Sequence, residues 1–239
     1  MRIITSTDLS EEQEDILLDA PLKGVILIEG PPGSGKTVMA FLRAEAISKN
    51  SDSVTLLMYN KVLQKFSQNG TQNKTIDVRT MHSWIYKWWK SFSKESTAPE
   101  IRRFKYDWTE MFTVIANKNN NKTLNLTKLD WNHLILDEGQ DFNNDMYEFL
   151  NLTRKCFFED KIAPSLTILA DENQRLNDDN STIDEIIKNL CINKDKHVFP
   201  LTKNYRNTDQ INKLINHFYV GIRTGTTMAS GLKGEKPKF

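Results

Sequence analysis

The 239-residue sequence has few cysteines, no long apolar run and almost no excess of charge of either sign. Its two cysteines, Cys156 and Cys191, are too few for the disulfide framework of a small secreted domain. No stretch is apolar for long enough to span a bilayer, and the N-terminal residues become acidic where a signal peptide would need an apolar segment. These absences predict a cytoplasmic protein that neither crosses a membrane nor depends on disulfide bonds.

The charge balance excludes one class of nucleic-acid binder. Lysine and arginine number 32 together, against 31 aspartate and glutamate residues, for a formal net charge of +1. Net charge therefore cannot hold this chain on nucleic acid, although a local basic groove could. With 38% hydrophobic and 26% charged residues, the composition is that of a globular protein able to bury a sizeable core.

Short apolar runs alternate with amphipathic stretches along most of the chain, which is typical of an α/β domain with a mainly parallel sheet. We expect strands at residues 25–28, 54–59, 76–80, 134–136, 166–170 and 198–201. We expect helices from Ser10 to Pro21, at residues 38–47, 62–66, 82–90, 100–116, 183–190 and 210–219, and one that ends near Phe158. Trp84 and Trp88 lie at helical spacing, so core packing is favoured over base stacking for both.

One segment breaks this alternation. Residues 91–128 hold polar stretches and the low-complexity tract Asn117–Lys122, and we interpret them as a helical insertion at the rim of the core, outside the sheet. The remainder of residues 1–220 is expected to form one domain. Residues 221–239 carry four glycines and no helical periodicity, which indicates a flexible tail or the start of a further domain.

A phosphate-binding motif follows the first predicted strand and precedes a helix. Its glycines would let backbone N–H groups curl around phosphate oxygens at a helix N-terminus. In such loops the lysine, here Lys36, binds the β- and γ-phosphates, and the hydroxyl of Thr37 binds Mg2+. The strand–loop–helix context makes a glycine turn without a ligand the weaker interpretation. The loop consists of Gly30, Pro31, Pro32, Gly33, Ser34, Gly35, Lys36 and Thr37.

Two adjacent acids, Asp137 and Glu138, follow the predicted strand at residues 134–136. We expect Asp137 to hold Mg2+ and Glu138 to orient and deprotonate the attacking water. Alone, such a pair would be read as solvated acids at the end of a strand. Together with the phosphate-binding loop upstream, it favours hydrolysis of a nucleoside triphosphate.

Five segments in this order resemble those of superfamily 1 helicases of the UvrD/Rep type. The resemblance covers residues from about 8 to 210. It implies a RecA-like P-loop ATPase domain that uses ATP and Mg2+ and acts on single-stranded DNA or RNA. It also implies that Gln13 contacts the adenine, whereas the sequence alone makes Gln13 the capping-box partner of Ser10, and both roles can coexist. The segments are Gln13, the loop at 30–37, Asp137–Asp141, Ala170–Gln174 and Asn204–Arg206.

The same resemblance assigns further roles around the γ-phosphate. It implies that Gln140 and Gln174 sense this phosphate, and that Arg206 approaches it and stabilises charge in the transition state. A surface amide is the alternative for Gln174, and an ion pair with Asp209 is the alternative for Arg206.

Two segments would contact nucleic acid if the resemblance holds. The first contains Asn60 and Lys61, and the second contains Thr80, His82 and Ser83. The family's usual aromatic residue is missing after the Ala170–Gln174 segment, which is one departure from the pattern.

A second departure is the short insertion at residues 91–128, and a third is that the sequence stops before the family's later motifs, which lie in a second RecA-like domain. We therefore expect slow hydrolysis, no duplex unwinding and weak, salt-sensitive strand binding by residues 1–239 alone. An ATP-dependent switch attached to a nuclease and a non-catalytic P-loop scaffold are the alternative functions.

Overall fold

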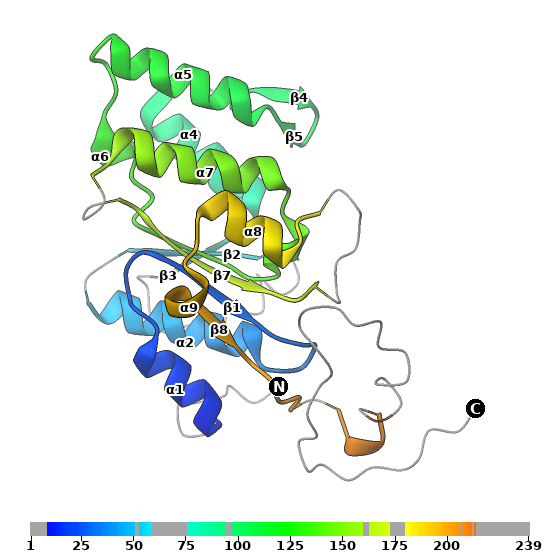
Figure 1. Ribbon diagram of the computed structural model, residues 1–239. Coiled ribbons are helices and arrows are strands. Elements are labelled where there is room, and N and C mark those ends of the chain that lie inside the picture. The colour runs from blue at the N-terminus through cyan, green and yellow to red at the C-terminus, as the bar shows by residue number, and fades with distance from the viewer. Residues whose placement is uncertain are drawn as a thin grey trace.

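The computed structural model of the chain describes residues 9–50, 53–58, 76–93, 97–159, 163–172, 180–205, 207–211 and 213. Its centre is a six-stranded sheet in the order β3-β2-β6-β7-β1-β8 (Figure 1). Every strand pair in this sheet is parallel, which confirms the predicted α/β fold class. The strands are β1 (Val25–Glu29), β2 (Val54–Leu57), β3 (Ile76–Arg79), β6 (His133–Leu136), β7 (Ser165–Ala170) and β8 (Val198–Pro200).

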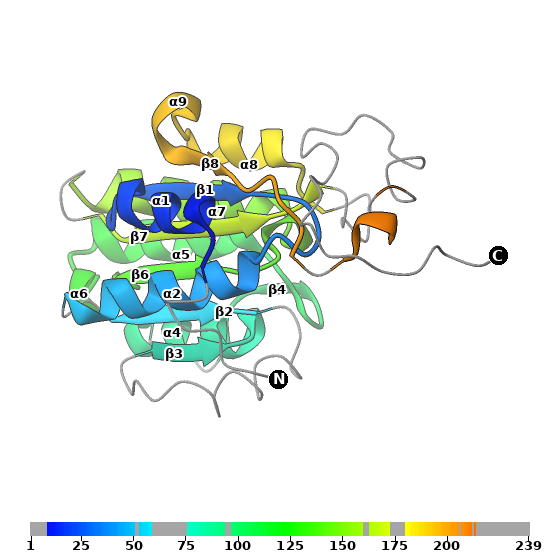
Figure 2. The same ribbon diagram turned by 90° about the horizontal axis from the view of Figure 1, so that it is seen from below.

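Helices cover both faces of this sheet, as Figures 1 and 2 show. One face carries α1 (Glu11–Asp19) and α2 (Lys36–Lys49). The other face carries α4 (Met81–Ser93), α5 (Trp108–Asn120), α7 (Asn144–Phe157) and α8 (Ile183–Leu190). In the described ranges, no helix combines the length and the apolar character that crossing a membrane requires. The shorter elements are α6 (Leu126–Leu129), the 3-10 helix η2 (Gly139–Asp141) and α9 (Lys194–His197).

The central strands are mostly apolar because both of their faces are covered. In β1, Val25 and Leu27 pack into the large core under α7 and α8, whereas Ile26 and Ile28 pack into a smaller core against α2. All residues of β7 are buried as well. A strand covered on both sides gains by burying every side chain, so continuous apolar runs are the sequence signal of such a sheet.

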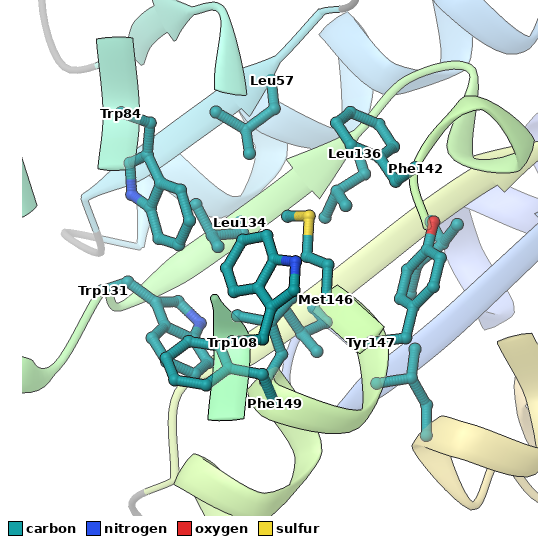
Figure 3. Packing of buried hydrophobic residues seen from close by; sticks show 14 of the residues in the cluster. Leu57, Trp84, Trp108, Trp131, Leu134, Leu136, Phe142, Met146, Tyr147 and Phe149 are labelled. Atoms are coloured by element: carbon teal, nitrogen blue, oxygen red, sulfur yellow. The ribbon is translucent and has the colours of Figure 1, made fainter. Parts of the chain in front are cut away.

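Aromatic side chains fill the larger core (Figure 3). Trp84 stacks on Trp88 with ring centroids 5.2 Å apart, and Trp88 also meets Trp131 and Phe149 edge-on at 6.0 Å each. Both Trp84 and Trp88 are buried, which confirms the prediction that they pack in the core. Their rings are therefore not available to stack on bases.

The predicted helix over residues 100–116 is wrong in its first half. Glu100–Arg102 (β4) and Lys105–Tyr106 (β5) form an antiparallel hairpin that adds no strand to the six-stranded sheet. The helix α5 begins only at Trp108, because the side chain of Asp107 caps it by accepting a hydrogen bond from the Glu110 N–H at 2.9 Å.

From that cap, α5 runs through Asn120, into the tract that the sequence marked as low-complexity. Its Trp108, Met111 and Ile115 are buried in the large core. The predicted helix at 62–66 lies outside the described residues, as does most of the one at 210–219.

A buried polar network ties α2 to the middle of the sheet. Arg43 is buried and donates from Nε to Oγ1 of Thr167 at 2.9 Å, and its other nitrogens donate to the carbonyl oxygens of Ala20 and Pro21. Nε2 of His133 lies 2.9 Å from the same hydroxyl. The Thr167 oxygen already accepts a hydrogen bond from Arg43. The hydroxyl proton of Thr167 is therefore free to be donated to Nε2 of a neutral His133. Burial, and then the charge of Arg43, lower the pKa of His133 to about 3.

Stability should therefore depend on pH through His133. Below its ordinary pKa of 6.5 the unfolded chain protonates this histidine, whereas the folded protein does not until about pH 3. Each pH unit below 6.5 should then remove about 1.4 kcal/mol of stability. Urea unfolding should show the free-energy advantage of wild type over His133→Gln shrinking by that slope as the pH falls. A constant difference would contradict this account, and His197→Gln on α9 is the control variant.

Candidate nucleotide-binding site

The loop at residues 30–37 joins β1 to α2 at the carboxyl edge of the sheet. Gly35 is the N-cap of α2 and has a φ of 90°, a left-handed conformation that favours glycine. A Cβ on Gly30 would lie 2.8 Å from Cβ of Leu201 and 2.8 Å from Oγ of Ser34. Glycine is thus required at both ends of the loop, at Gly30 by close packing and at Gly35 by backbone conformation.

Lys36 turns its ammonium group back over this loop. Its Nζ donates to the carbonyl oxygens of Gly30 at 2.9 Å and Pro31 at 3.1 Å. The same nitrogen lies 3.3 Å from Oδ2 of Asp171, the residue that follows β7. Lys36 and Asp171 are both buried, so the ion pair is shielded from water. The cation expected to bind phosphate is therefore held at the loop by the chain's own oxygens.

Thr37 and Asp137 meet as the sequence predicts for a Mg2+ site. The Thr37 hydroxyl donates to Oδ2 of Asp137 at 2.8 Å, from the first turn of α2 to the end of β6. Burial, and then the charge of Glu138, raise the pKa of Asp137 to about 6. A hydroxyl and a carboxylate are hard oxygen donors of the kind that Mg2+ prefers. The two side chains thus fit the metal that was predicted for them.

Gln140 connects the carboxyl ends of β6 and β7. Its Nε2 donates to Oε2 of Glu138 at 2.9 Å, and its Oε1 accepts from the Asp171 N–H at 2.9 Å. Gln140 is buried, and Glu138 has a left-handed φ of 54° at the start of η2. Gln140 therefore orients Glu138, the expected base, and also contacts Asp171, the ion-pair partner of Lys36.

Gln13 takes part in both the cap and the loop. Its Oε1 accepts from the Ser10 N–H at 3.2 Å, which completes the predicted capping box of α1. Its Nε2 donates to the Ser34 carbonyl oxygen at 3.0 Å. The contact of Gln13 with adenine stays a prediction, and its position beside the loop is compatible with it.

Two residues of the Asn204–Arg206 segment also bind the backbone of the loop, a role that the sequence did not predict. Nδ2 of Asn204 donates to the Pro32 carbonyl oxygen at 2.7 Å, and the Tyr205 N–H donates to the Gly33 carbonyl oxygen at 2.8 Å. The motif order in the sequence was their only signal. Arg206 itself lies outside the described residues, as do Gln174, Asn60 and Lys61.

The loop also contains a buried hydroxyl that fits a polar ligand. Ser34 is 1% exposed, and its Oγ has no hydrogen-bond partner among the described residues. Buried polar atoms in native proteins are nearly always hydrogen-bonded, so such an exception calls for a partner. Together with Lys36 and Thr37, this hydroxyl makes a donor set that suits phosphate oxygens.

The predicted nucleic-acid residues Thr80, His82 and Ser83 lie together where β3 ends and α4 begins. Oγ1 of Thr80 accepts from the Ser83 N–H at 3.4 Å. The ring of His82 faces the β4–β5 hairpin and contacts Phe104 and Tyr106. Because the carboxyl ends of parallel strands meet at one edge, these residues share an edge with the phosphate-binding loop.

Known proteins show which family this chain belongs to and which fold it shares. A family model for the Schlafen group 3 DNA/RNA helicase domain matches residues 23–231. The crystal structure of Pif1 helicase from Candida albicans is similar, with a TM-score of 0.53 and 17% identity, over 87% of this chain and 43% of that chain. This similarity confirms the predicted RecA-like fold.

Two Bacteroides Pif1 structures match less well. The one bound to ssDNA has a TM-score of 0.47 and 16% identity, over 87% of this chain and 45% of that chain. The one in complex with ADP-AlF4 has a TM-score of 0.48 and 17% identity, over 89% of this chain and 47% of that chain. The chain thus spans less than half the length of these solved structures. Among curated proteins, none matches this chain.

Removing Lys36 should destabilise the fold through Asp171. Lys36→Ala takes away the cation that faces a buried carboxylate, and breaking such a pair typically costs about 3–5 kcal/mol. Asp171→Asn keeps the shape of that side chain without its charge, so the double variant should recover much of the loss. Urea unfolding of the single and double variants measures the coupling free energy between the two residues. A value within about 0.5 kcal/mol of zero would show that the pair is not coupled.

Proposed function

Since this chain belongs to the Schlafen group 3 DNA/RNA helicase domain family, we propose that it binds ATP with Mg2+ and hydrolyses ATP as part of a helicase motor on single-stranded nucleic acid. One observation carries the proposal. Lys36 and Thr37 of the loop meet Asp171 and Asp137, which follow neighbouring strands at one edge of the sheet. That edge is where ligands bind in open α/β sheets.

Each of these residues has a distinct task in the proposed reaction. Lys36 and the loop N–H groups bind the phosphates, and Thr37 and Asp137 would hold Mg2+. When bound, this metal neutralises charge on the phosphate oxygens. Glu138 accepts a proton from the attacking water, and the amide of Gln140 holds the carboxylate in place.

A scaffold that has lost catalysis is a weaker proposal than a hydrolase. Lys36, Thr37, Asp137 and Glu138 are all present, and the hydroxyl of Thr37 already contacts Asp137. A site that only bound a partner would not need a carboxylate held by a buried amide, as Glu138 is by Gln140. Catalytic competence is therefore the simpler account of these contacts.

Other parts of the proposal rest on the order of motifs. Gln13 would contact the adenine, while Gln174 and Arg206 would contact the γ-phosphate, which is consistent with a UvrD/Rep-type motor. We also propose a second RecA-like domain in the full protein, since the chain spans less than half of the solved helicases that it matches. Such a domain would close on the same sheet edge.

The nucleic-acid side of the proposal uses that edge too. The family is described as a DNA/RNA helicase domain, and Thr80, His82 and Ser83 lie on the edge that carries the phosphate-binding loop. Asn60 and Lys61 complete the proposed set. This placement would put the ATP site and the nucleic-acid site on one edge of the same sheet.

Glu138→Gln should preserve ATP binding and abolish most hydrolysis. The glutamine amide is too weak a base to take a proton from water, but its oxygen can still accept the hydrogen bond from Gln140. We expect single-turnover hydrolysis, measured with single-stranded nucleic acid present, to fall about a hundredfold or more. Calorimetry should show the same ATP–Mg2+ affinity as for wild type.

Asp141 is the rival base and supplies the matched control. Burial, and then the charge of Glu138, raise its pKa to about 6. If Glu138 is the base, Asp141→Asn should hydrolyse ATP at nearly the wild-type rate. Full activity of Glu138→Gln would place the base elsewhere. A wild-type protein without affinity for ATP–Mg2+ would refute the nucleotide site itself, and the Lys36→Ala/Asp171→Asn double variant gives the expected signal of a protein that cannot bind.

A further inference from the structure

The β4–β5 hairpin lies beside the proposed nucleic-acid residues. The ring of His82 is 5.1 Å from that of Phe104 and 5.5 Å from that of Tyr106, and Nδ1 of His82 lies 3.1 Å from the Tyr106 hydroxyl oxygen. His82 is in the first turn of α4, directly after β3. Figure 2 accordingly shows β4 at the end of the sheet toward which the strands point. The hairpin therefore extends the edge that carries the ATP site.

The tip of this hairpin presents an aromatic ring to solvent. Phe104 is 58% exposed, although phenylalanine is ordinarily buried. The guanidinium of Arg103 lies 5.0 Å from the centre of its ring, and the ring of His82, tilted by 51°, lies 5.1 Å away. A ring next to a cation and a second ring, with more than half of the residue still exposed to water, can accept a further flat group.

The backbone at the tip reinforces this interpretation. Phe104 has a φ of 66°, a left-handed conformation that is rare for a bulky side chain and is usually taken by glycine or asparagine. Its N–H donates to Oε2 of Glu100 at 3.3 Å, which fixes the turn. The backbone of Phe104 is thus in an unfavourable conformation, and burial of its ring does not offset this cost, because the residue is exposed.

Positive charge surrounds the exposed ring. Arg102, Arg103 and Lys105 are all exposed, and none of the ion pairs among the described residues involves them. By contrast, Arg79 and Lys87 nearby are both paired with Asp77, at 2.7 and 3.2 Å.

The same stretch of chain holds two acids: Glu100 accepts the hydrogen bond from the Phe104 N–H, and Asp107 caps α5. The three cations outnumber these two acids, so residues 100–107 carry a positive formal charge. The tip is therefore a locally basic surface on a chain whose net charge is close to zero.

We propose that the hairpin tip binds single-stranded nucleic acid, with a base stacked on Phe104 and the phosphates held by Arg102, Arg103 and Lys105. Aromatic faces flanked by cations suit unpaired bases, because every base has a face to stack and every nucleotide carries a phosphate. A duplex keeps its bases stacked on one another and offers none to the ring. The inference rests on the proposed function, which it deepens by naming a strand contact.

Phe104→Asn tests the stacking without disturbing the turn. Asparagine tolerates the left-handed backbone, so the hairpin should keep its fold, but it has no ring to stack on. We expect the dissociation constant for a fluorescein-labelled oligothymidylate to rise at least about fivefold. Ile101→Ala is the matched control, because Ile101 is 64% exposed on the same hairpin and the change should leave affinity intact. Calorimetry should show unchanged ATP–Mg2+ binding by both variants.

Phe104→Trp gives a direct signal from the same position. All five native tryptophans are buried, so only the indole at position 104 would be exposed and able to stack on a base. Its emission should be quenched when unlabelled oligothymidylate is added, and affinity should stay near that of wild type. The Arg103→Gln variant should lower the dependence of affinity on salt concentration, since one phosphate contact is lost.

The outcomes separate the two proposals. If wild type binds the oligonucleotide but Phe104→Asn binds it equally well and the Phe104→Trp emission is unchanged, the hairpin does not contact the strand and the inference fails alone. If wild type binds ATP–Mg2+ but no oligonucleotide, the nucleic-acid part of the proposed function fails with it. Equal affinity for a blunt duplex would overturn the assignment to single strands.

Discussion

A buried lysine with two kinds of oxygen partner organises this domain's functional edge. The ammonium of Lys36 contacts two carbonyl oxygens of its own loop and the carboxylate of Asp171, which follows another strand. A cation shielded from water is stable only when such partners surround it. Any ligand that draws Lys36 away must supply comparable negative charge, and the phosphates of a nucleotide do so.

The hydrogen bonds of the Lys36–Asp171 pair connect the phosphate-binding loop to the proposed catalytic base. The N–H of Asp171 is bonded to Gln140, and Gln140 is bonded to Glu138. A change of partner at Lys36 would therefore act on the group that orients the proposed base. The same edge continues through β2 to β3, His82 and the hairpin, so ATP and a nucleic-acid strand would bind along one edge of the sheet.

The sequence predicted best what local patterns determine. The apolar run at 25–28, the capping box at Ser10 and the loop at 30–37 each depend on residues close together in the chain, and the structure contains all three. The pair between Lys36 and Asp171 joins residues 135 positions apart, so it required the placement of β7 beside β1. The hairpin at 100–106 was mistaken for a helix because its strands are too short for an alternating pattern to show, and its Tyr106 is fixed by His82.

A structure of the chain with a non-hydrolysable ATP analogue and Mg2+ tests the central claim most directly. The account predicts that Nζ of Lys36 leaves the carbonyl oxygens of Gly30 and Pro31 for the β- and γ-phosphates. It also predicts that the Thr37 hydroxyl turns from Asp137 to the metal. An analogue bound away from this loop, or a Lys36 that keeps its present partners with the analogue in place, would contradict it.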